Sequence, residues 1–242
     1  MKNFFFLIAF LFIYQSAPAQ LFSKEKVVKD ANSGKGSLDN DLLSWGYYVG
    51  FNSYDFNFDY VQNKEDLQVK KSTGFNVGLI GNMRINKFLD LRLEPGLSIT
   101  TRTLEYPESY FQGMEFTSSD LEREIKSTYI YVPMLLKFST KRLNNFKPFI
   151  VGGLSTALNL SSNQDNPDDN SAGKFRTKKS MYFYELGFGI DFYLHNFKFT
   201  PSIRGVFALN DELVRDADPD SPWTSNIETM KTRGLFINLT FQ

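Results

Sequence analysis

The chain contains no cysteine and only one histidine. The lack of cysteine excludes disulfide scaffolds, thiolate metal sites and cysteine nucleophiles, and the lone histidine cannot form a histidine cluster around a metal. Charge of one sign is not in excess, because 27 basic residues balance 27 acidic ones, so the basic footprint of a nucleic-acid binder is missing. We therefore expect no nucleic-acid partner, no metal and no cofactor.

Long apolar runs are also missing, since no stretch after the N-terminal region reaches the roughly eighteen residues of a transmembrane helix. The N-terminal run, residues 4–14, follows Lys2 and precedes the small residues Ala17 and Ala19. This order is typical of a secretory signal peptide cleaved after Ala19. We expect a signal peptide at residues 1–19, a periplasmic leader at residues 20–44 and one folded domain at residues 45–242.

Aromatic residues are abundant, at 16% of the chain, and several segments alternate apolar and polar residues. In residues 89–100 the odd positions are leucine or isoleucine apart from Pro95, and the even positions are polar or glycine. A period of two indicates a β-strand. The same pattern predicts eight strands, at residues 45–58, 71–83, 88–103, 127–139, 147–160, 180–193, 197–210 and 231–242.

The connections between these strands alternate between long and short. Outer-membrane barrels have long extracellular loops and short periplasmic turns, and an even strand number returns both ends of the barrel to the periplasm. We predict an all-β fold, an eight-stranded antiparallel transmembrane β-barrel located in the outer membrane and in contact with its lipid. The alternative is a soluble eight-stranded barrel, which would turn its apolar residues inward around a ligand.

A membrane barrel turns its apolar residues to the lipid and its polar residues to the lumen. Aromatic residues near strand ends are then expected to form an interfacial girdle. The members proposed for this girdle are Trp45, Tyr47, Tyr129, Tyr182 and Tyr184.

Charges on the polar faces would meet in a narrow lumen, where they must pair because little water reaches them. A short loop at Leu194 and His195 would place Glu185 directly opposite Arg204, and Asp191 directly opposite Lys198. A loop one residue later would place each pair one diagonal step apart. The expected lumenal charge network, structural in role, consists of Arg92, Glu94, Glu185, Asp191, Lys198 and Arg204.

Four segments carry a resemblance to a known family: Tyr-Val-Pro-Met-Leu-Leu-Lys-Phe at residues 131–138, and residues 147–153, 187–191 and 234–241. Together with the signal peptide, their order and spacing resemble the PorT-type outer-membrane barrels of Bacteroidetes-like bacteria, over most of residues 45–242. The resemblance implies a non-enzymatic accessory role in type IX protein secretion, and in gliding motility where that occurs. It also implies other secretion-system proteins as partners, and it supplies no catalytic motif.

Two other readings stay open: a structural or porin-like barrel of unrelated role, and a barrel enzyme that modifies lipid. An enzyme would usually need a general base, and the only histidine, His195, falls in a predicted periplasmic turn, where we expect a plain polar residue. Asp216, Asp218 and Asp220 have the spacing that begins a calcium loop. The glycine and glutamate that such a loop needs further on are absent, so we expect a solvated extracellular loop there.

Overall fold

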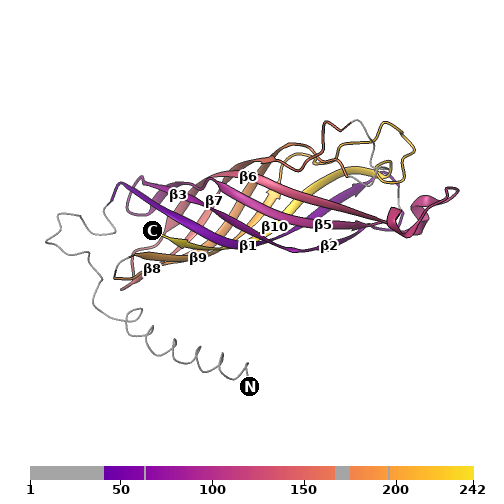
Figure 1. The fold of residues 1–242 in the computed structure, drawn as a ribbon. Coiled ribbons are helices and arrows are strands. Elements are labelled where there is room, and N and C mark those ends of the chain that lie inside the picture. Colours follow the sequence, from indigo (N-terminus) through magenta and orange to yellow (C-terminus); the bar gives the residue numbers. More distant parts are fainter. Residues whose placement is uncertain (1–40, 63, 167–174, 196) are drawn as a thin grey trace, which may run out of the picture.

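The structure is a computed structural model that describes residues 41–62, 64–166, 175–195 and 197–242. The predicted signal peptide (1–19) and most of the predicted leader (20–44) lie outside these residues. Figure 1 shows an elongated barrel whose strands run obliquely to its long axis. The strands are β1 (Leu43–Tyr60), β2 (Gln68–Lys71), β3 (Thr73–Arg84), β4 (Leu89–Leu93), β5 (Gly96–Glu105), β6 (Glu122–Ser139), β7 (Phe146–Asn159), β8 (Ser180–Tyr193), β9 (Lys198–Ala208) and β10 (Ile227–Phe241).

These segments make eight membrane-crossing strands, because two of the crossings are interrupted. β2 and β3 are separated only by Ser72, and β4 and β5 only by Glu94 and Pro95. Pro95 has no amide proton to donate to a neighbouring strand, which accounts for the second break. The predicted eight-stranded fold is confirmed. No helix among the described residues is long and apolar enough to cross a membrane.

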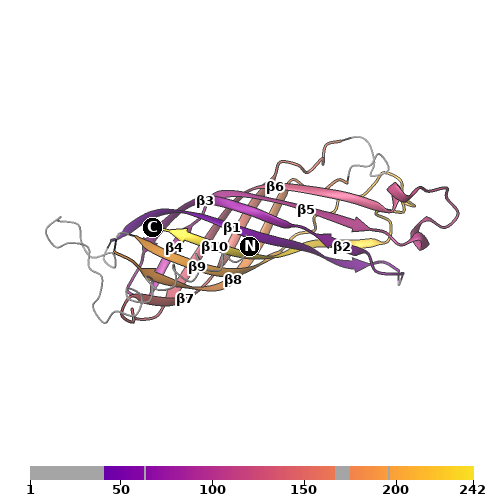
Figure 2. The ribbon, with the colours of Figure 1, turned by 60° about the horizontal axis from the view of Figure 1, so that its bottom comes forward.

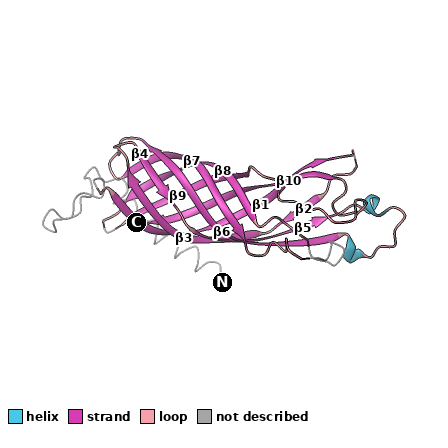
Figure 3. Cartoon of the chain, turned by 90° about the horizontal axis from the view of Figure 1, so that it is seen from above, coloured by secondary structure: helices cyan, strands magenta, loops and turns pink. Residues whose placement is uncertain are grey.

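The sheet closes on itself through β1. This strand pairs with β10, from Tyr47 opposite Phe241 onward, and with β3 as far as Ser53 opposite Thr73. All other neighbours pair antiparallel in chain order, and Figure 3 shows their common tilt around the ring.

The connections segregate by length. The short turns, residues 85–88, 140–145 and 194–197, lie at the end of the barrel that also holds the C-terminus (Figure 2). The described parts of the longer loops lie at the opposite end, at residues 61–62, 64–67, 106–121, 160–166, 175–179 and 209–226. The short turns are periplasmic and the loops extracellular, as predicted.

The faces of the strands also match the prediction. On β4 and β5, Leu93 is 46% exposed and Leu97 points outward with it, whereas Arg92 is 3% exposed and Ser98 is buried. Exposed leucine on an isolated barrel is leucine that faces lipid in the membrane. The soluble-barrel alternative, with apolar residues inside, is therefore wrong.

One member of the expected girdle is misplaced. Trp45, Tyr47, Tyr182 and Tyr184 are exposed on the outer wall, but Tyr129 is fully buried inside the barrel. The cause is its position on β6, where it shares the inward parity of Lys137. Both faces of that strand are fairly apolar, so alternation alone did not reveal which face points inward.

The alternation of polarity inverts towards the extracellular end. On β1 the outward residues change from apolar at Phe51 to charged at Asp55, while the inward residues change from Asn52 to Phe56. Asp55 pairs on the outside with Arg233, at 2.9 Å. Charge on the outer wall marks the end of the lipid-facing belt, because hydrocarbon cannot solvate it.

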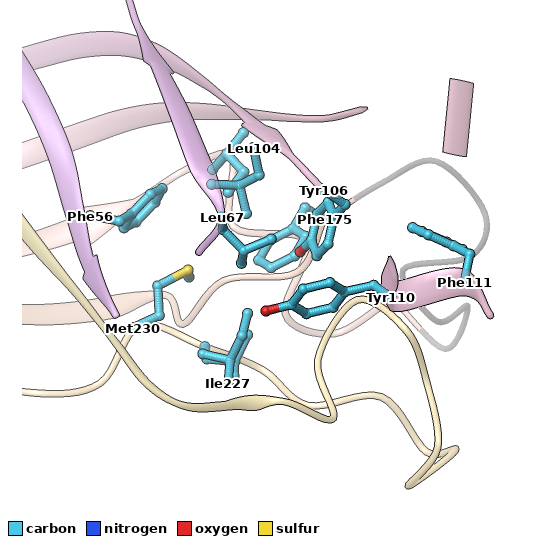
Figure 4. Close-up of a cluster of buried hydrophobic side chains, with 11 residues drawn as sticks. Phe56, Leu67, Leu104, Tyr106, Tyr110, Phe111, Phe175, Ile227 and Met230 are labelled. Carbon is cyan, nitrogen blue, oxygen red and sulfur yellow. The ribbon is translucent and has the colours of Figure 1, made fainter. Parts of the chain in front are cut away.

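Apolar residues of the extracellular loops and of the adjoining strand ends pack together in one cluster (Figure 4). One of these loops, 106–121, contains two 3-10 helices, η2 (Glu108–Phe111) and η3 (Ser118–Asp120). In the loop of three aspartates, Asp218 and Asp220 are exposed, as expected of a solvated loop, whereas Asp216 pairs with Arg176 at 3.1 Å. The cluster consists of Phe56, Leu67, Leu104, Tyr106, Tyr110, Phe111, Ile125, Phe175, Leu213, Ile227 and Met230.

Candidate functional site

The periplasmic half of the lumen holds an ion cluster that crosses from one wall to the other. Arg204 on β9 reaches Glu94, between β4 and β5, at 2.8 Å, and Glu185 on β8 at 3.3 Å. Arg92 on β4 completes the cluster with a 2.9 Å contact to Glu94. All four side chains are almost fully buried. The cluster lies in a space that water hardly reaches, where each charge must be paired.

The expected direct pairing of Glu185 with Arg204 is wrong. Val206 lies opposite Glu185, and Gly187 lies opposite Arg204, so the strands are shifted to the diagonal arrangement considered as the alternative. The cause is the turn, in which the Leu194 N–H donates to the Phe197 carbonyl at 3.0 Å and moves the loop by one residue. The ions still meet, because a Cβ at Gly187 would lie 2.5 Å from Arg204 Cγ and its absence leaves room for the arginine.

Asp191 has a different partner from the one predicted. Lys137 on β6 contacts it at 2.5 Å and Thr200 donates to it at 2.7 Å. Lys198 lies opposite Tyr193, one diagonal step from Asp191, and makes no ion pair with it within 4.0 Å in the described part of the chain. The structure thus joins four of the predicted residues in one cluster and places Asp191 and Lys198 in a neighbouring, more periplasmic layer.

An aromatic layer lies above the ion cluster and also crosses the lumen. Tyr131 on β6 connects the two, since its hydroxyl donates to Glu185 at 2.6 Å. Its ring lies 5.6 Å from Phe236 on β10, which belongs to the opposite wall, and Tyr54 on β1 lies 5.8 Å from Tyr129 on β6. The layer also includes Phe183, Met181, Val206, Ala157 and Ala208.

A second buried ion pair closes the extracellular half. Arg102 on β5 donates to Thr232 on β10 at 2.7 Å and lies 3.5 Å from Glu212, and neither charged side chain is exposed. Glu212 comes from the loop 209–226 and accepts from Tyr129 at 2.8 Å and from Thr232. The Arg102 guanidinium also lies 3.8 Å from the centre of the Phe56 ring, a cation–π contact.

Sequence reasoning missed this pair and Lys137 for different reasons. Arg102 continues the polar face of the strand that contains Arg92, so extending the alternation by two residues would have found it. Lys137 lies on a strand whose two faces are both fairly apolar. Glu212 lies in a loop, where no periodicity exists and only tertiary packing brings the carboxylate into the lumen.

The arrangement is suited to sealing and bracing the barrel. Except for Lys198, each ion described above has an opposite charge within 4.0 Å, and the ion cluster and the aromatic layer both join facing walls. His195 is exposed in the turn after β8, whereas the residues of the clusters are buried. No group of three or more histidine, cysteine or acidic residues that could hold a metal occurs among the described residues.

Comparison with known proteins gives a family match and structural similarities. A family model described as "Outer membrane protein beta-barrel domain" matches residues 19–214. The outer membrane protein OprG from Pseudomonas aeruginosa is 12% identical with a TM-score of 0.42, over 82% of this chain and 93% of that one. The outer membrane protein AlkL, solved in lipid bilayers, is 10% identical with a TM-score of 0.43, over 86% and 94%. Neisserial surface protein A is 11% identical with a TM-score of 0.40, over 83% and 98%. No curated protein matches the chain.

Proposed function

This chain belongs to the outer membrane protein beta-barrel domain family, and from that premise we propose that it is a non-enzymatic, non-conducting barrel that serves as an accessory component of type IX protein secretion. Its localisation is the outer membrane. The proposed partners, beyond membrane lipid, are other proteins of the secretion system. Gliding motility would depend on it in organisms that glide.

The observation that carries the proposal is the filled lumen. Three layers of side chains from facing walls meet in it: the cluster around Arg204, the aromatic layer around Tyr131, and the Arg102–Glu212 pair. An eight-stranded barrel has an interior that side chains just fill. A protein with this interior cannot carry folded cargo itself, so a role in secretion must be exerted through its surfaces, beside a larger translocon.

The secretory assignment is supported by the resemblance of residues 131–138, 147–153, 187–191 and 234–241 to PorT-type barrels. In the structure these segments are parts of β6, β7, β8 and β10; the first three are neighbours in the sheet, and β9 separates β8 from β10. The competing assignments are a structural or porin-like barrel and a lipid-modifying enzyme. The location of His195 in a periplasmic turn favours neither of them.

A deletion strain tests the proposal. We expect the proteins in the culture medium, compared by mass spectrometry with those of the parent, to lose the type IX cargo. A plasmid copy should restore them, and a copy carrying His195→Asn should restore them equally, because a turn residue has no chemical role here. Unchanged export in the deletion strain would refute the secretory role. Failure of the His195→Asn copy at normal protein level would instead revive the enzyme reading.

A further inference from the structure

The two ends of the barrel carry opposite charge although the whole chain is neutral. The extracellular loop 106–121 contains Glu108, Glu115 and Asp120 and no basic residue. The periplasmic turns 85–88 and 140–145 contain lysine and arginine and no acidic residue. A fixed separation of charge along the barrel axis makes the periplasmic rim attractive to anions.

Two cations of this rim are free to meet a ligand. Lys87 and Lys141 are exposed, and neither ammonium forms an ion pair with a carboxylate of the described residues. Arg142, by contrast, is already engaged, since it lies 4.0 Å from the Tyr193 ring and donates to Asn145 at 2.9 Å.

The two lysines belong to adjoining turns. The Ser139 N–H donates to the Phe88 carbonyl at 2.8 Å, which holds the end of β6 against the turn between β3 and β4. Beneath the turns, the ammonium of buried Lys147 lies 3.5 Å from the Lys87 carbonyl. A third cation therefore adds to the positive field of Lys87 and Lys141.

Apolar side chains stand exposed among these cations. Ile85 and Phe88 flank Lys87, and Leu143 follows Lys141 by two residues, each with about half of its surface exposed. Apolar side chains beside basic ones are costly in water but suit the boundary between headgroups and acyl chains, where the apolar group enters the leaflet and the cation stays at the phosphates. A soluble acidic partner would explain the exposed lysines but not the exposed apolar side chains beside them.

We infer that the rim formed by Ile85, Lys87, Phe88, Lys141 and Leu143 is a binding surface for the phosphate headgroups of anionic phospholipid in the periplasmic leaflet. The lysines contact the phosphate and the apolar residues contact the first part of the acyl chains. This surface is separate from the lumen and does not depend on the proposed secretory role. Its consequence is a preference for anionic over zwitterionic lipid at one edge of the barrel.

The test uses the full chain in vesicles of equal parts phosphatidylcholine and phosphatidylglycerol. After gentle detergent extraction, the lipid retained by the folded barrel is counted by mass spectrometry. We expect phosphatidylglycerol to be enriched over its share in the vesicles, and the double variant Lys87→Gln, Lys141→Gln to lose this enrichment. The expected loss is about fivefold per lysine, which corresponds to about 1 kcal/mol for each cation at a membrane surface.

Matched variants make the result specific. Lys64→Gln with Lys179→Gln removes two cations from the extracellular side, and Lys179 is exposed and forms no ion pair with a carboxylate of the described residues, like the rim lysines, so enrichment should be unchanged. Lys87→Arg with Lys141→Arg should retain it, and added salt should weaken it. Heat-modifiable migration on gels identifies the folded barrel in every sample. Equal retention of both lipids by the native chain, or equal losses from the rim and extracellular variants, would overturn the inference.

Discussion

Arg204 holds the centre of the lumen through two carboxylates, and its contact with Glu185 spans a diagonal between neighbouring strands. Removing one member of a buried ion pair leaves the other charge uncompensated, at a cost of about 3–5 kcal/mol. We therefore expect Glu185→Gln and Arg204→Met each to destabilise the barrel. The double variant should cost less than the sum, because residues in contact do not act independently.

The measurement is a double-mutant cycle on unfolding by urea in detergent or lipid. The coupling free energy between the two changes should exceed about 0.5 kcal/mol, because the effects of mutations at distant, independent sites are additive to within about that amount. Strict additivity of the two changes would show that Glu185 and Arg204 do not interact in the membrane.

For single residues of the lumen, the sequence predicts which side chains point inward but not always which side chains contact each other. Alternation placed Arg92, Glu94, Glu185 and Arg204 on polar faces, and the structure finds all four in one cluster. The partner of Asp191 could not be inferred in the same way. Lys137 reaches it from β6, across the intervening β7, and such a contact depends on the tilt and stagger of the whole ring.

The strands keep one pairing register both within the lipid-facing belt and beyond it, towards the extracellular end. β5 shows both environments. Leu97 lies on the outer wall between Val77 and Ile130, in the lipid-facing belt. Thr103 lies on the same outer wall, but between Lys70 and Glu124. An outward charge should thus be costly at the first position and tolerated at the second, since the cost of arginine on the lipid face depends on depth.

Leu97→Arg should destabilise the barrel by about 2–4 kcal/mol and Thr103→Arg by no more than about 1 kcal/mol. Folding yield into lipid vesicles and urea unfolding of the folded fraction measure the difference. The two variants share a strand, a face and an incoming side chain, so only depth distinguishes them. Similar damage from both would mean that the lipid-facing belt has been placed wrongly.

The inversion of polarity also explains which elements sequence analysis found incompletely. Strand β1 was predicted to end at residue 58 and β10 to begin at residue 231, yet they extend to Tyr60 and from Ile227. Beyond the lipid-facing belt, apolar residues such as Phe56 point inward to the apolar cluster. The rule that apolar residues face outward therefore fails there, and the ends of the strands were predicted too early or too late. The apolar cluster at the extracellular end was not predicted, because its residues come from four loops and four strands that only the folded chain brings together.

The whole molecule is a barrel whose number of strands, sidedness and lipid-facing surface follow from alternation and loop length. Its closed interior follows from packing that only the assembled ring reveals, because Tyr131 meets Phe236 and Arg204 meets Glu94 across the lumen. We propose that these contacts close the lumen to ions and cargo. Everything proposed about its role beside a larger translocon depends on that closure.

Planar-bilayer recording on the purified full chain tests closure most directly. The sample is first shown to be folded by its heat-modifiable migration, and a general porin in the same bilayers provides the open-channel control. Side chains fill the interior of an eight-stranded barrel, so we predict little or no stable conductance after insertion. A large, steady conductance that scales with the number of inserted barrels would show that the lumen is open.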